Sequence, residues 1–215
     1  MTPPEIFRLP NLLSLSRVLI APIIGYYIWR GDSSAAFIAL ALLGIAGVTD
    51  GLDGYLARRL DRVTSLGIAL DPICDKILAG VLVIFLILYR EFPIWLAAVI
   101  VGRDLLIVIA GSFLIRRSRL SLPSNLSGKY AFTAITVLLG SYVIRFEFGI
   151  TLTTYATVVL IAVSLISYGK VFVTILRSAE PPQFKDSFTL RMIRTTATII
   201  YTIVYFYRLY SDVIR

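Results

Sequence analysis

The chain has 215 residues, of which 58% are hydrophobic and 16% are charged, and its formal net charge is +8. A typical soluble domain has about a quarter of its residues charged, so this composition predicts an integral membrane protein rather than a large soluble core. The basic residues stand between apolar runs and not in an aromatic–basic surface pattern, which argues against a nucleic-acid partner. There is no histidine, which excludes histidine-based triads and histidine-rich zinc sites. The single cysteine, Cys74, allows no intrachain disulfide and is expected to be a small buried residue.

Six apolar runs follow one another along the chain, each near the ~20 residues that a membrane-spanning helix needs. They lack the alternation of barrel strands, so we predict an all-α integral membrane fold with six transmembrane helices. The predicted spans are 11–29, 35–57, 66–88, 93–115, 130–144 and 150–176. Residues 1–10 are expected to lie at the membrane surface. A cleaved signal peptide is the alternative for the first run, but its length and Arg17 favour a retained helix.

A basic tail follows the sixth run, after a pair of prolines. We therefore divide the chain into a transmembrane domain, 1–182, and a cytoplasmic or interfacial tail, 183–215. Residues 190–210 mix Ile, Tyr and Phe with arginine, and their apolar centre, 195–207, is short for a span. We expect an interfacial helix here, and a seventh spanning helix is the alternative.

Positive charge gathers on alternate loops. The loops after the second, fourth and sixth runs hold most of the basic residues: Arg58, Arg59, Arg62, Arg116, Arg117, Arg119, Lys129, Arg177, Lys185, Arg191 and Arg194. Each loop on the other side holds one: Arg30, Arg90 and Arg145. Because loops rich in Lys and Arg stay in the cytoplasm, both termini and the loop between the second and third runs are predicted to be cytoplasmic.

Four carboxylates border or interrupt the second and third runs: Asp50, Asp53, Asp71 and Asp75. An acidic side chain in or near hydrocarbon is costly, so such residues are functional candidates. At about 100° per residue, each pair shares one face of its helix. Because a short loop joins the two helices, the four carboxylates can converge in one cavity at the cytoplasmic end of the membrane.

Four carboxylates in one cavity repel one another and cannot all ionise unaided. Two divalent cations would neutralise them, and all-oxygen ligands favour Mg²⁺ or Mn²⁺. A two-metal site of this kind suits phosphoryl chemistry, and Arg58 beside it can meet a phosphate. Two other readings remain open: the acids pair with loop arginines only to hold the loop, or they form the relay of a small cation or proton transporter.

The stretch from Asp50 to Asp75 resembles the signature of the CDP-alcohol phosphatidyltransferases, D-x2-D-G-x2-A-R-x8-G-x3-D-x3-D, at every fixed position. Those positions are Asp50, Asp53, Gly54, Ala57, Arg58, Gly67, Asp71 and Asp75. Residues 10–22 and 123–133 also resemble parts of the first and fifth helices of that family. The likeness covers roughly residues 8–176 and leaves out the tail.

The resemblance implies a membrane enzyme with six helices, usually a homodimer, that works on membrane lipid. Such an enzyme transfers a phosphatidyl group from CDP-diacylglycerol to an alcohol acceptor and releases CMP. By that likeness Asp75 is the general base on the acceptor hydroxyl. The implied metal ligands are Asp50, Asp53, Asp71 and Asp75. The residues implied around the CDP moiety are Gly54, Ala57, Arg58 and Gly67.

The resemblance leaves two alcohol acceptors to distinguish. The chain most resembles the branch with glycerol-type acceptors, which contains phosphatidylglycerophosphate synthases and eukaryotic-style cardiolipin synthases. We expect glycerol 3-phosphate as acceptor, with phosphatidylglycerol as the alternative because G-R-D-L-L-I-V, residues 102–108, looks closer to the cardiolipin side. Lys129, Arg116 and Arg17 are candidate acceptor contacts, and each can also be a topology or headgroup charge. Arg103 and Asp104 are expected to form a buried structural pair rather than a substrate contact.

Overall fold

The computed structural model describes residues 9–59, 65–118, 125–178 and 188–214, and the regular structure in these ranges is entirely helical. It describes the helical backbone but not the side chains of residues 9, 10, 50–59, 65–69, 71, 72, 116, 118, 178, 188–190, 193 and 214. The α-helices are α1 (Leu9–Arg30), α2 (Ser33–Arg59), α3 (Ser65–Tyr89), α4 (Ile94–Ser118), α5 (Leu126–Val143), α6 (Glu147–Ser178) and α7 (Phe188–Leu209). A short π-helix, η2 (Tyr210–Ile214), follows α7.

Each of the six predicted runs forms one helix, α1 to α6, so that part of the prediction is confirmed. The helices α5 and α6 begin a few residues before the predicted apolar runs, because polar residues extend them beyond their apolar parts. The side-chain carbonyl of Asn125 accepts a hydrogen bond from the backbone N–H of Gly128 at 2.8 Å and caps α5. Glu147 begins α6, where a negative charge suits the helix dipole.

Three of the described helices are long and apolar enough to cross a membrane: Asn11–Arg30, Ile94–Ile115 and Glu147–Arg177. The apolar helical stretch Ser33–Thr49 is shorter. Large apolar side chains such as Leu19, Ile109 and Ile166 are exposed on these helices. Exposed leucine and isoleucine suit a surface in contact with lipid, so these are features of an integral membrane protein.

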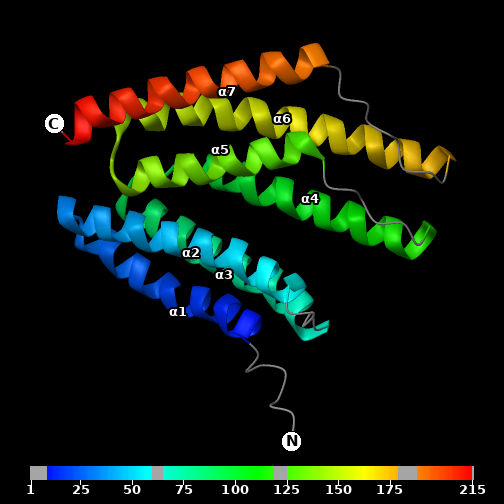
Figure 1. The fold of residues 1–215 in the computed structure, drawn as a ribbon, viewed down its shortest axis with the longest axis horizontal. Helices are drawn as coiled ribbons and strands as arrows, with labels where there is room; N and C mark the ends of the chain where they lie inside the picture. The colour runs from blue at the N-terminus through cyan, green and yellow to red at the C-terminus, as the bar shows by residue number, and fades with distance from the viewer. Residues whose placement is uncertain (1–8, 60–64, 119–124, 179–187, 215) are drawn as a thin grey trace, which may run out of the picture. The chain divides into compact units, whose positions relative to one another are not determined.

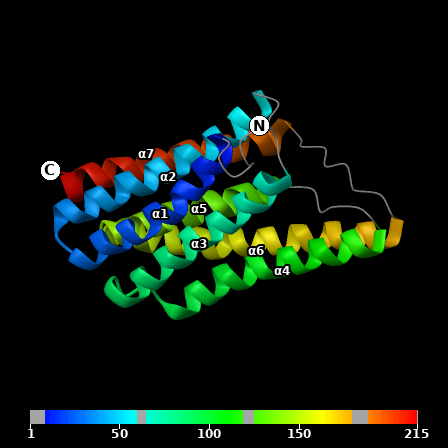
Figure 2. The same ribbon diagram turned by 90° about the horizontal axis from the view of Figure 1, so that it is seen from below.

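The chain divides into two compact units, one of Met1–Ile94 with Tyr142–Ile144 and one of Trp95–Ser141 with Arg145–Arg215. In the first unit α1 packs against both α2 and α3 (Figures 1 and 2). Ile24 of α1 and Leu86 of α3 are fully buried there.

The first unit also contains a close approach of two helices. A Cβ added to Gly25 of α1 would lie 2.6 Å from the ring of Phe85 of α3, which is well inside van der Waals contact. The missing side chain therefore allows α1 and α3 to pack closely, as small residues do between membrane helices.

The second unit holds α4 to α7. Leu114 of α4 and Val171 and Ile175 of α6 form a buried apolar cluster. The helix α7 runs in the opposite direction to α6 and lies along it (Figure 1).

The turn between α5 and α6 is packed against α7. Arg145 has a positive φ of 55° there, and the backbone N–H of Phe146 donates to the carbonyl of Ser141 at 3.0 Å. The Phe146 ring is 2% exposed and meets the ring of Tyr205 edge-on at 5.4 Å. A Cβ at Gly149 would collide with the Phe146 ring. Glycine is therefore required at position 149 by the space available.

We expect Gly149→Ala to lower the free energy of unfolding by about 1–3 kcal/mol, because Phe146 is held by its neighbours and cannot move aside. Gly169→Ala on the same helix is the matched control, since a Cβ there meets nothing within 4 Å. That control should be neutral or slightly stabilising, as alanine is the better helix former. Thermal unfolding in detergent measures both variants, and equal midpoints would contradict the packing at Gly149.

Candidate active site

The four signature carboxylates belong to the ends of two helices in the first unit. Asp50 and Asp53 lie in the C-terminal half of α2, and Asp71 and Asp75 lie in the N-terminal half of α3. Only residues 60–64 connect the two helices, and Figure 1 shows both ends, together with the start of α1, at one end of the unit. The backbone therefore brings the four positions to the same end of this unit.

Most of the predicted site side chains fall outside the described residues. Those of Asp50, Asp53, Gly54, Ala57, Arg58, Gly67, Asp71 and Arg116 do so. Their convergence on a metal or on CDP stays a prediction. Among the side chains that the structure does describe, no three Asp, Glu or Cys residues gather into a group able to hold a metal ion.

Asp75 is described, and it forms an ion pair with Arg17 of α1 through Oδ1 and Nη1. The two side chains differ in exposure: that of Arg17 is 1% exposed and that of Asp75 is 45% exposed. Arg17 therefore holds one side of the carboxylate from within the protein, while the other side of Asp75 remains accessible. Cys74, the preceding residue, is buried as predicted.

The buried face of α1 is polar near the start of the helix and apolar further along. Ser14 and Arg17 are buried near its start, and Ala21, Ile24 and Ile28 are buried further along. At about 100° per residue these five positions share one face of the helix. Sequence reasoning had singled out only Arg17, although the spacing of Ser14 from Arg17 and Ala21 is a signal for a shared buried face.

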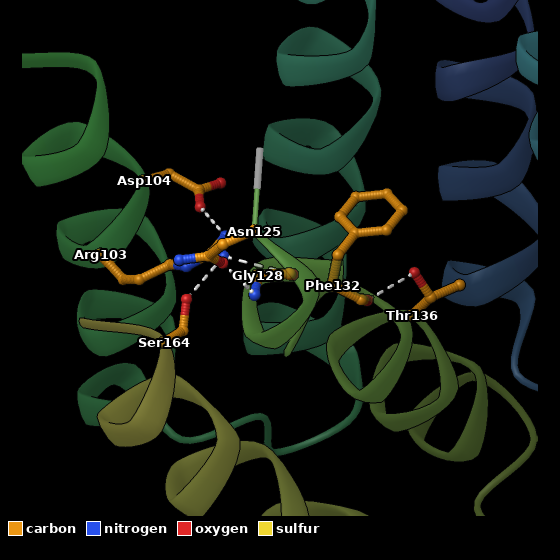
Figure 3. A network of polar contacts seen from close by, with 7 residues as sticks. All are labelled: Arg103, Asp104, Asn125, Gly128, Phe132, Thr136 and Ser164. Carbon is orange, nitrogen blue, oxygen red and sulfur yellow. Dashed lines mark hydrogen bonds and ion pairs between the residues drawn. The ribbon is translucent and has the colours of Figure 1, made fainter. Parts of the chain in front are cut away.

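A second polar cluster lies in the second unit and ties three helices together (Figure 3). Arg103 of α4 is 8% exposed and donates to Ser164 Oγ of α6 at 3.2 Å and to the carbonyl of Gly128 of α5 at 3.4 Å. Asn125 donates to Ser167 Oγ of α6 at 3.1 Å. The cluster thus fixes the start of α5 against α4 and α6.

The predicted pairing of Arg103 with Asp104 is confirmed, at 2.7 Å between Nη1 and Oδ1. Its expected burial is only half right, because the Asp104 side chain is 49% exposed. Consecutive residues on a helix point about 100° apart, so only Arg103 faces inward. Lys129, one of the candidate acceptor contacts, is exposed on α5 immediately after Gly128. Its expected role stays a prediction.

A sequence model described as CDP-alcohol phosphatidyltransferase matches residues 7–168. The chain belongs to this family. The match includes the carboxylates on α2 and α3 and also Arg17. Of the two function classes that the sequence left open, transferase and transporter, family membership supports the transferase.

Two kinds of relative share the family's sequence. The chain is 40% identical over 136 residues to a probable cardiolipin synthase (CMP-forming) of Drosophila melanogaster, covering 63% of this chain and 41% of the relative. It is 38% identical over 122 residues to the cardiolipin synthase (CMP-forming) of Homo sapiens, covering 56% and 39%. It is 32% identical over 162 residues to a CDP-diacylglycerol–glycerol-3-phosphate 3-phosphatidyltransferase of Aquifex aeolicus, covering 74% and 88%.

The extent of these matches differs. The chain spans about two fifths of the length of the fly and human cardiolipin synthases, 41% and 39%. It spans nearly all of the Aquifex relative, 88%. The family match ends at residue 168, so α7 lies beyond it.

Proposed function

We propose that the chain transfers a phosphatidyl group from CDP-diacylglycerol to a glycerol-type alcohol and releases CMP, with glycerol 3-phosphate as the first acceptor to test. The observation that carries this proposal is Asp75, the last carboxylate of the signature, paired with buried Arg17 and still half accessible. Membership of the family and the printed names of both kinds of relative support the reaction.

Asp75 takes the proton of the acceptor hydroxyl in this proposal. The hydroxyl oxygen attacks the β-phosphorus of CDP-diacylglycerol and forms the new P–O bond. The bond between that phosphorus and the oxygen that bridges the two phosphates breaks, and CMP leaves with the bridging oxygen. With no histidine in the chain, a carboxylate is the available base of suitable strength.

The donor set suits Mg²⁺ or Mn²⁺, because Asp50, Asp53, Asp71 and Asp75 offer only oxygen ligands. Two such ions, when bound, would stabilise the negative charge on the transferring phosphate and on its leaving group. Gly54, Ala57, Arg58 and Gly67 are proposed to bind the CDP moiety. The small residues leave room for the nucleotide, and Arg58 meets its phosphates.

We also propose six membrane spans, α1 to α6, with the N-terminus and the carboxylate cluster at the cytoplasmic face. The alternation of basic loops supports this orientation. The start of α1 lies at the same end of the first unit as the end of α2 and the start of α3, which agrees with it (Figure 1). A homodimer is proposed on the family resemblance alone.

Arg17 was a candidate acceptor contact, but its burial and its partner favour a different role. We propose that it positions Asp75, since the pair connects α1 directly to the expected base on α3. Lys129 and Arg116 then remain the candidates for binding an acceptor phosphate.

Cardiolipin synthesis, with phosphatidylglycerol as acceptor, is the second candidate function. It is favoured by the fly and human relatives and by the G-R-D segment at residues 102–104.

The purified chain should release CMP from CDP-diacylglycerol in a reaction that requires Mg²⁺ or Mn²⁺ and stops when EDTA is added. Asp75→Asn should abolish turnover, because the amide cannot accept the proton, while its side-chain oxygen can still accept a hydrogen bond from Arg17 and keep α1 against α3. Undiminished CMP release by this variant would refute the assignment of the base.

The acceptor can be identified by giving the purified chain CDP-diacylglycerol with glycerol 3-phosphate, phosphatidylglycerol, serine or inositol in turn. Mass spectrometry then identifies the lipid product. We expect phosphatidylglycerophosphate from glycerol 3-phosphate. Cardiolipin formed from phosphatidylglycerol alone would establish the second candidate instead.

If glycerol 3-phosphate is the acceptor, Lys129→Ala should raise the KM for glycerol 3-phosphate.

Arg17→Ala should lower kcat by roughly 100-fold with little change in the KM of the acceptor, because a displaced base loses its alignment with the hydroxyl. Arg17→Lys should recover part of kcat, since lysine keeps the charge but not the forked geometry. Arg30→Ala is the control on the same helix, because Arg30 pairs at 2.9 Å with Asp32 on the surface. A raised KM for glycerol 3-phosphate with kcat unchanged would assign Arg17 to the acceptor.

A further inference from the structure

The helix α7 has two contrasting faces. Arg194, Tyr201, Tyr205 and Arg208 fall on one face at about 100° per residue. Arg194 and Tyr205 contact α5, and Arg208 contacts the first turn of α6. The opposite face carries exposed apolar and aromatic side chains. These are Met192 (52% exposed), Ile199 (52%), Ile203 (62%) and Phe206 (61%). The polar face is thus turned into the protein and the apolar face away from it.

Two contacts place α7 along α5, and a third joins it to the first turn of α6. The guanidinium carbon of Arg194 lies 5.7 Å from the ring centre of Tyr130, near the start of α5. At the other end, the hydroxyl of Tyr205 shares a hydrogen bond of 2.9 Å with Ser141. The guanidinium carbon of Arg208 lies 5.2 Å from the ring centre of Phe148, just beyond the turn.

The contacts with α5 show that α5 and α7 are parallel over this length. The same number of residues separates Arg194 from Tyr205 as separates Tyr130 from Ser141, about 16 Å along either axis. The helix α7 therefore runs beside α5 in the same direction and opposite to α6 (Figure 1).

This arrangement differs from that of a helix lying in the membrane surface. The helix α6 is long and apolar enough to span, and a surface helix would cross it at a steep angle rather than lie along it. A surface helix would also turn its polar face to water, whereas the hydroxyl atoms of Tyr201 and Tyr205 are turned into the second unit.

We infer that α7 crosses the membrane as a seventh helix and that its apolar face, Met192, Ile199, Ile203 and Phe206, meets the acyl chains of the bilayer. This inference replaces the interfacial helix expected from the sequence with the alternative, a seventh spanning helix. The C-terminus then lies on the same side as the α5–α6 turn. This inference concerns membrane placement and does not depend on the reaction.

The two arginines are compatible with a span. The segment between Arg194 and Arg208 covers about 20 Å, somewhat less than the hydrocarbon thickness. Long arginine side chains near helix ends reach toward the interface, which extends the usable length. The aromatic rings under both guanidinium groups compensate part of the cost of burying them.

Sidedness can be measured by adding one reporter cysteine at a time to the full chain and labelling it with a membrane-impermeant maleimide on sealed vesicles of known orientation. Glu147→Cys reports the α5–α6 turn, Arg177→Cys reports the end of α6, and Ser211→Cys reports the end of α7. All three positions are exposed. Native Cys74 is buried, so the unsubstituted chain supplies the background.

We expect Ser211→Cys to be labelled from the side that labels Glu147→Cys and not from the side that labels Arg177→Cys. Labelling together with Arg177→Cys would overturn the inference. Asp212→Cys repeats the test if Ser211→Cys is poorly folded.

Contact with acyl chains needs a second measurement. A fluorophore on Ile203→Cys should be quenched more by nitroxides near the acyl-chain ends than by nitroxides on headgroups, and a fluorophore on Ser211→Cys should show the reverse. Stronger quenching by headgroup nitroxides at position 203 would restore the interfacial helix. No quenching by either lipid would mean that another protein surface, such as a second copy of this chain, covers this face.

Discussion

The constraint on which the structure depends is the cost of burying an arginine among apolar helices. Arg17 and Arg103 are 0% and 8% exposed, and a buried guanidinium must find carboxylate or hydrogen-bond partners. Arg17 finds Asp75, which ties α1 to α3. Arg103 finds Asp104, Ser164 and the carbonyl of Gly128, which tie α4 to α6 and α5. Apolar packing is non-directional, so these directional contacts determine which turn of each helix faces which turn of its neighbour.

The same constraint shapes the candidate active site. One buried arginine can balance one carboxylate, and the signature brings four to the same end of the first unit. In the proposed function, divalent cations balance the remaining negative charge, and phosphoryl transfer would use them. The Asp75 side chain is held by Arg17 and is nevertheless 45% exposed. A base for an incoming hydroxyl needs both properties, because it must be oriented by the protein and reachable by the substrate.

The sequence predicts features that depend on residues close together in the chain, and it does not predict contacts between distant residues. Apolar runs predicted α1 to α6 correctly, because the apolar content of a helix is a property of consecutive residues. The family signature identifies the four carboxylates for a similar reason, because all its positions lie on two consecutive helices, α2 and α3. The partner of Arg17 was not predictable in this way, since Asp75 lies 58 residues away and meets it only when α1 packs on α3. Asn125 could have been found from its place before α5, where asparagine is a favoured cap.

The helix α7 shows how the contacts of a helix change the interpretation of its composition. Its arginines, threonines and tyrosines lower its apolar content, which favours an interfacial helix as long as the segment is considered by itself. Once the partners of Tyr205 are known, Ser141 and Phe146, that tyrosine is seen to be a contact within the protein. Ser141 is fully buried and Phe146 nearly so, at 0% and 2% exposed. Without α7 the hydroxyl of Ser141 would lose its bond to Tyr205, and the turn after α5 would lose the ring that packs on Phe146. A helix beyond the family match therefore completes the packing around the α5–α6 turn, which lies within the match.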